Sequence, residues 1–239
     1  MAKVTDVFVS GTLENIVFYY RMGRRCSRMK RSSIKQTKAT QIRGINFGIA
    51  ARAGKGLRNG LEKFLPSPTN RSMQSRLSGA IARWLGLQNA SELPAYEDAA
   101  YISKFNFTTG AGFTERFKVP FTVSQPTQGN GISVAIDAFT PTQNIQAPAG
   151  AGSVKLTITV AGCILISGEP NGHVTHTLNI PYNDVEIPAQ LMEFTIPVVP
   201  GSLTVMAAKL QYYTSNNGNS IEIKEPAWMP ASIVNAWYI

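Results

Sequence analysis

The sequence predicts an α+β protein that is mainly β: a basic β-hairpin and a two-helix hairpin, followed by an antiparallel β-sandwich (Ig-like or jelly-roll-like). Three observations lead to this fold class. Basic residues concentrate in the first 86 positions, apolar residues recur at helical spacing between positions 42 and 84, and short alternating runs separated by Gly, Pro and Asn follow position 100. We therefore expect a basic hairpin and helical module at residues 1–90 and a sandwich domain at residues 91–239.

Charge is distributed unevenly along the 239 residues, whose net charge is +9. Residues 1–86 contain 17 bases and 3 acids, a net charge of +14, whereas residues 87–239 contain 6 bases and 11 acids, a net charge of −5. Such asymmetry predicts an anionic partner for the first part, either nucleic acid, a membrane surface or an acidic patch on a neighbouring subunit.

The predicted hairpin carries the densest positive charge. Residues 16–20 form a β-branched and aromatic run, a turn follows around Gly23, and residues 25–31 form the return strand. Neither face of that return strand is apolar, so it is expected to meet solvent, phosphates or an acidic surface. The candidate binding residues are Arg21, Arg24, Arg25, Arg28, Lys30 and Arg31, extended by Lys35, Lys38 and Arg43, with Phe18, Tyr19 and Tyr20 as candidate platforms for base stacking.

Two helices are expected next. The first follows an apolar stripe formed by Ile42, Ile45, Ile49, Ala53, Leu57, Leu61 and Phe64. Its glycines weaken it, but the spacings Gly44/Gly48 and Gly56/Gly60 would let another backbone approach closely. The second follows Met73, Leu77, Ile81 and Trp84, with Ser67 as the N-cap and Gly86 as a left-handed C-cap.

The remainder reads as short strands. We expect them within residues 113–121, 132–136, 154–160, 174–180, 191–198, 203–213, 220–224 and 233–239, with turns at residues 128–131, 147–150, 169–172 and 216–219 and a long loop at 141–152. The apolar C-terminal run pairs within the sandwich or docks on a neighbouring subunit by strand addition, the first being the more common arrangement.

No catalytic or metal constellation is predicted, and no cofactor. His173 and His176 would face opposite sides of a strand, and Cys26 and Cys163 are expected to be separate thiols. Residues 54–60 are Gly-rich and basic but lack a phosphate-loop ending, so close helix packing explains them better. Glu92, Glu97 and Asp98 are read as a linker, or else as an acidic patch that docks the basic half.

The N-terminal third resembles a group of uncharacterised proteins from Bacteroidetes genomes and their phages. The shared pattern is Gly…Asn-x-x-Phe-Tyr, a basic Gly turn and an Arg…Phe-Gly-x-Ala helix, here Gly11, Asn15, Phe18, Tyr19, Gly23, Arg28, Arg43, Phe47, Gly48 and Ala50. The resemblance covers about residues 11–65. It implies a β-rich remainder and an association with phages or mobile elements, and it implies no enzyme activity.

These observations favour a non-enzymatic structural subunit that self-assembles as a virion, tail-like or filament protein. The expected partners are other copies of the chain and nucleic acid, contacted through its backbone. The sequence predicts neither a signal peptide nor a membrane span, so we expect synthesis in the cytoplasm and a final place in a virion or extracellular assembly. One alternative is a sandwich that binds carbohydrate or protein through exposed aromatics such as Tyr182, Tyr212, Tyr213 and Trp228. Another is an accessory protein that binds DNA or RNA without sequence preference.

Overall fold

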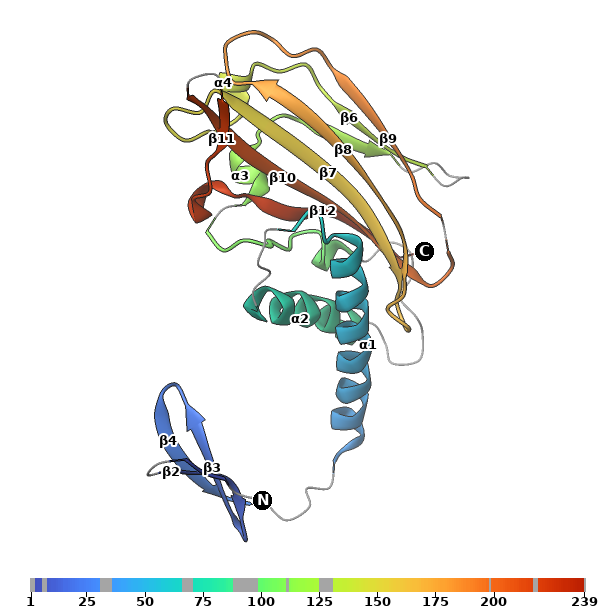
Figure 1. The fold of residues 1–239 in the computed structure, drawn as a ribbon. Helices are drawn as coiled ribbons and strands as arrows, with labels where there is room; N and C mark the ends of the chain where they lie inside the picture. Colours follow the sequence, from blue (N-terminus) through green and yellow to red (C-terminus); the bar gives the residue numbers. More distant parts are fainter. Residues whose placement is uncertain are drawn as a thin grey trace. The chain divides into compact units, whose positions relative to one another are not determined.

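A computed structural model describes residues 3–5, 8–30, 36–65, 71–87, 99–110, 112–124, 131–197, 199–216 and 219–238. The chain divides into two compact units, Met1–Gln41 and Ile42–Ile239 (Figure 1). The sequence predicts one module that contains the hairpin and both helices. Its predicted boundary, near residue 90, lies outside the described residues. In the structure the division falls in the first turn of the first helix, because the helices share a core with the β-rich part of the chain.

The first unit holds an antiparallel sheet of four strands in the order β1-β2-β3-β4. They are β1 (Lys3–Thr5), β2 (Phe8–Leu13), β3 (Ile16–Arg21) and β4 (Arg24–Met29). The expected hairpin is β3–β4. Its two turn residues, Met22 and Gly23, have φ angles of 50° and 75°, and two left-handed residues suit the twist of a two-residue hairpin. This turn sets Arg21 opposite Arg24.

The second unit is mainly β and antiparallel, as the sequence predicts. A three-stranded sheet has the order β5-β6-β9, and a five-stranded sheet has the order β11-β10-β7-β8, with β12 also paired to β10. The strands are β5 (Phe121–Ser124), β6 (Gly131–Ile136), β7 (Ser153–Ile164), β8 (Pro170–Pro181), β9 (Gln190–Thr195), β10 (Ser202–Asn216), β11 (Asn219–Glu222) and β12 (Ala231–Tyr238).

Three local predictions are wrong. Residues 113–116 form a short helix, α3 (Phe113–Arg116), because one helical turn brings the rings of Phe113 and Phe117 together, 5.2 Å apart, in the core. The expected loop at 141–152 begins with another helix, α4 (Pro141–Asn144), whose proline suits its first turn. The turn expected at 169–172 lies earlier, since β8 already begins at Pro170.

The two predicted helices are α1 (Lys38–Gly60) and α2 (Arg71–Leu87), and two 3-10 turns are η1 (Ala99–Tyr101) and η2 (Pro226–Trp228). The predicted stripe of α2 is confirmed, since Met73, Leu77, Ile81 and Trp84 are all buried. Gly86 as a left-handed C-cap is wrong, because α2 continues through it without a positive φ. The expected cap Ser67 lies outside the described residues. In α1 the stripe is buried from Ala53 onward, whereas Ile42 and Ile45 are exposed.

Strands β7 and β10 are buried on both faces of the five-stranded sheet. On one face, Ala161, Cys163, Leu203 and Val205 join the core formed with α1 and α2. On the other face, alternate residues such as Leu156 join the core formed with β6 and β9. Figure 1 shows the helices on one side of the long strands and the β5-β6-β9 sheet on the other. The predicted C-terminal strand is confirmed, and it pairs within the same chain, because β12 is antiparallel to β10.

Glycines bring α1 against the turn between β7 and β8. A Cβ atom at Gly56 would overlap the carbonyl oxygen of Gly168, and one at Gly168 would overlap that of Arg52. The Arg52 Nε atom donates a hydrogen bond to the Ile166 carbonyl oxygen at 2.8 Å in the same place. The predicted close approach is therefore confirmed at Gly56. It is wrong at Gly44, where a Cβ atom would meet nothing within 4 Å.

Substitutions at Gly56 and Gly44, which both lie in α1, should have opposite effects on the free energy of unfolding. Gly56→Ala should lower the free energy of unfolding by about 1–3 kcal/mol, because the added methyl group must displace backbone. The matched control Gly44→Ala should raise it by roughly 0.5–1 kcal/mol, since alanine restricts the unfolded chain and meets open space. Denaturant unfolding followed by circular dichroism measures both. Equal effects of the two substitutions would contradict the close packing of α1 against the β7–β8 turn.

Candidate nucleic-acid or partner interface

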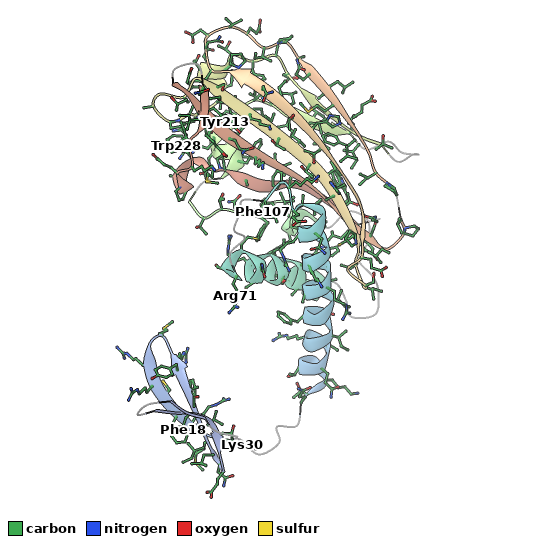
Figure 2. All side chains as sticks on the ribbon, in the orientation of Figure 1. Phe18, Lys30, Arg71, Phe107, Tyr213 and Trp228 are labelled. Atoms are coloured by element: carbon green, nitrogen blue, oxygen red, sulfur yellow. The ribbon has the colours of Figure 1, made fainter. Side chains whose placement is uncertain are left out.

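The predicted binding residues lie mostly on the first unit's sheet. Arg21 ends β3, while Arg24, Arg25 and Arg28 belong to β4, and all four side chains are exposed. Lys30 follows β4, and its backbone N–H donates to the Asn15 carbonyl oxygen at 2.6 Å. Figure 2 labels Lys30 and also Phe18, which lies within β3.

Two further predicted cations lie on α1. Lys38 begins α1 and Arg43 lies further along it, both exposed. Arg43 belongs to the second unit, so the structure does not place it with the sheet. Arg31 and Lys35 lie outside the described residues.

Strand register gives this sheet two unlike faces. Residues directly opposite each other on antiparallel strands point to the same side. One side, the basic face, therefore holds the pairs Arg21–Arg24, Tyr19–Cys26 and Val17–Arg28. The opposite side, the apolar face, holds Leu13, Ile16, Phe18 and Met29.

Two of the arginines contact tyrosine side chains. On the basic face the Arg28 guanidinium lies 6.0 Å from the centre of the Tyr19 ring, at the range of a cation–π contact. On the opposite side Arg25 Nε donates to the Tyr20 hydroxyl at 3.1 Å. The three candidate stacking residues are thus divided: Tyr19 accompanies the arginines of the basic face, whereas Phe18 and Tyr20 point the other way.

The sheet shows no buried core among the residues whose burial is described. Among its residues whose burial is described, 10–30, none is buried, and Ile16 and Met29 are 43% and 75% exposed. Domains of fewer than about 40 residues usually need a disulfide, a metal or a partner, because they bury too little surface. Both cysteines of the chain are free thiols, so no disulfide supplies this support. The sheet therefore combines a surface suited to phosphates with one suited to apolar contact.

Sequence reasoning missed the apolar face. The return strand alone has no apolar side, as predicted, but β2 and β3 supply Leu13, Ile16 and Phe18 next to Met29. The signal that could have found it is the two-residue turn at Met22 and Gly23. Such a turn fixes the register of the hairpin and hence which side chains share a face.

His176 is another candidate residue that the structure describes. His176 Nε2 lies 2.9 Å from the Glu193 carbonyl oxygen, and its ring packs edge-on against Phe194. No cluster of three or more His, Cys, Asp and Glu side chains suited to a metal ion occurs in the described part of the chain. The glycines of residues 54–60 lie inside α1, and Glu92, Glu97 and Asp98 lie outside the described residues.

The aromatic residues that would favour carbohydrate or protein binding by the sandwich do not form an exposed cluster. Tyr212 is fully buried, and its hydroxyl donates to the Gln146 carbonyl oxygen at 2.8 Å. The Tyr182 hydroxyl donates to the Ile145 carbonyl oxygen at 3.1 Å. Trp228 is half-buried, with its ring edge-on to Tyr212.

Comparisons with protein-family models, curated proteins and solved structures found no match to this chain. Among the described helices, none has the length and apolar character needed to cross a membrane.

Cys26 offers a direct reporter for the basic face. Cys163 is buried, and burial raises the pKa of its thiol to about 12, so alkylation of the native protein should be confined to Cys26. An oligonucleotide bound to the basic face should slow alkylation of Cys26 several-fold at low salt. The protection should disappear as salt rises, because phosphate contacts release counterions.

The matched control moves the thiol by one residue. In a Cys26→Ser, Ser27→Cys double variant the reactive thiol points to the opposite face of the same strand. Its alkylation rate should change little when the oligonucleotide is added. Protection of position 27 without protection of position 26 would contradict the assignment of the basic face to nucleic acid.

Proposed function

We propose that this chain is a non-enzymatic structural subunit that self-assembles as a virion, tail-like or filament protein. Its basic N-terminal sheet contacts nucleic-acid backbone or acidic surfaces of neighbouring subunits. The observation that carries the proposal is the sheet with a basic face, an apolar face and no buried residue among those described.

The basic face suits phosphates better than base edges. Arg24 and Arg28 lie four residues apart on one strand, about 13 Å along it, with Arg21 on the neighbouring strand. Guanidinium groups spread over an exposed sheet can neutralise several phosphates at once, and such contacts carry no sequence information. Binding by this face should accordingly be sequence-independent and strongly weakened by salt.

The apolar face supports the assembly half of the proposal. Leu13, Ile16 and Met29 are large exposed side chains on one side of a small sheet. Covering them contributes about 25 cal/mol per Å² of apolar surface removed from water. We infer that a neighbouring subunit covers this face. Residues 87–239 have a net charge of −5, which favours their contact with the basic face of another copy.

The second unit would form the body of such an assembly. Its antiparallel sheets of five and three strands share one core, which supports the jelly-roll-like form of the sandwich over the seven-stranded Ig-like form. The resemblance of residues 11–65 to phage-associated proteins of Bacteroidetes agrees with a virion or extracellular assembly as the final location.

A second candidate is an accessory protein that binds DNA or RNA without building a shell. The basic face alone favours it, because phosphate contacts need no assembly. The two candidates differ in oligomeric state, so they are separated by measuring assembly with and without nucleic acid.

Assembly is tested by sedimentation velocity and negative-stain imaging over a range of protein concentrations, with and without nucleic acid. Wild-type protein should form particles or filaments. The Ile16→Thr, Met29→Thr double variant should assemble less, because this cross-strand pair lies on the apolar face. The control Leu191→Thr removes an exposed apolar side chain from β9 and should assemble normally.

Two outcomes would contradict the proposal. A strict monomer at high concentration, with or without nucleic acid, would remove the assembly half. Monomers that bind nucleic acid would support the accessory protein instead.

A further inference from the structure

A cleft of about 290 Å³ opens where the helical cover of the five-stranded sheet ends. The side of β10 that packs against the helices is apolar at Leu203, Val205 and Ala207 but continues as Lys209 and Gln211. Past the end of α1, residues 63–65 form one wall of the cleft, and residues 209–211, 222–224 and 228–231 form the rest. Figure 2 labels Trp228 and Tyr213 at this end of the sheet.

Positive charge outweighs negative charge in the cleft. Its described lining contains Lys63, Lys209 and Lys224 but one carboxylate, Glu222. Both oxygens of that carboxylate are already engaged, since Gln211 Nε2 donates to one at 2.7 Å and Lys224 Nζ lies 3.7 Å from the other. Glu222 therefore cannot neutralise all three ammonium groups.

Lys209 is the most confined of these cations. Its Nζ atom donates to the Phe64 carbonyl oxygen at 2.8 Å and lies 5.2 Å from the centre of the Phe64 ring. Burial lowers the pKa of its ammonium group, the charge of Glu222 partly offsets this, and Lys155 adds to it. An ammonium group has three N–H donors, of which the Phe64 carbonyl uses one. An anion in the cleft would replace the hydration that Lys209 loses on burial.

Trp228 contributes an aromatic side chain to the lining of the cleft. The Arg116 guanidinium lies 4.1 Å from the ring centre, and the Tyr212 ring packs edge-on at 5.9 Å. Met229 and Pro230 also line the cleft. A ring held from two sides offers contact area at little conformational cost, as in many small-molecule sites.

We propose that this cleft binds a small organic anion, in which a carboxylate or phosphate group meets Lys209 and Lys63 and a flat apolar group lies along Trp228. The described lining residues all belong to the second unit. The proposal goes beyond the proposed function and does not depend on it, because none of these described lining residues comes from the N-terminal sheet.

Calorimetric titration with benzoate and with phenyl phosphate tests the site, and the two probes distinguish a carboxylate from a phosphate ligand. At least one anion should bind, and neutral benzyl alcohol should bind at least about tenfold more weakly, because it lacks the charge that the ammonium groups recognise. Lys209→Gln should weaken anion binding about tenfold or more.

Two control variants distinguish a loss of anion binding at the cleft from a loss of folding. Lys63→Gln changes an exposed lining residue and should weaken binding several-fold in a protein that still folds, whereas Lys118→Gln, outside the cleft, should leave binding unchanged. Because the pKa of Lys209 is lowered, its charge is lost at a lower pH than that of an ordinary lysine. Anion affinity should therefore fall as pH rises through that lowered pKa. Absence of anion binding, equal binding of benzyl alcohol, or affinities unaffected by both Lys209→Gln and Lys63→Gln would overturn the proposal.

Discussion

Coverage of both faces of β7 and β10 is the constraint on which the second unit depends. A strand exposed on one side alternates between apolar and polar residues, but these two strands must be apolar over much of their length because each face meets a separate core. The helices are needed to cover one face, and α1 can lie close enough only because Gly56 and Gly168 have no side chains at the point of contact. Where that cover ends, the sheet turns polar at Lys209 and the cleft opens.

The first unit presents the opposite situation. Its four strands form a regular antiparallel sheet. None of its residues whose burial is described is buried, and the apolar side chains of Ile16 and Met29 are exposed. Hydrogen bonds between strands do not stabilise a small sheet in water without apolar burial. The same lack of burial among the residues described makes this unit suitable as a binding surface, with Arg21, Arg24 and Arg28 on one side and exposed apolar residues beside Arg25 on the other. The proposed assembly would supply the missing burial.

Much of the fold is readable from periodicity. Alternation predicts β6, β7 and β8, and helical spacing predicts α2, because apolar residues recur at a constant period along part or all of each element. Periodicity misleads at Phe113 and Phe117, where positions four apart fit a strand and a single helical turn equally well. The sequence also cannot show that α1 and α2 pack against strands of the five-stranded sheet, since that depends on contacts between distant residues such as Gly56 and Gly168.

The candidate interface, like the fold, is predictable from the sequence only in part. The cations of β3 and β4 are found from composition alone. Which of them share a face depends on the register that the Met22–Gly23 turn sets, and Arg25 lies on the opposite face from the others. The cleft around Lys209 cannot be predicted from the sequence, because its walls come from four separate segments and lysines are ordinarily exposed residues.

Hydrogen exchange of the backbone amides tests most directly the claim that the N-terminal sheet depends on a partner. In dilute protein without nucleic acid, amides of β2, β3 and β4 should exchange rapidly, while those of β7 and β10 stay protected. In assembled or nucleic-acid-bound protein, β2, β3 and β4 should become protected and β7 and β10 should not change. Strong protection of β2, β3 and β4 in the dilute protein, unchanged by assembly or by nucleic acid, would contradict the account.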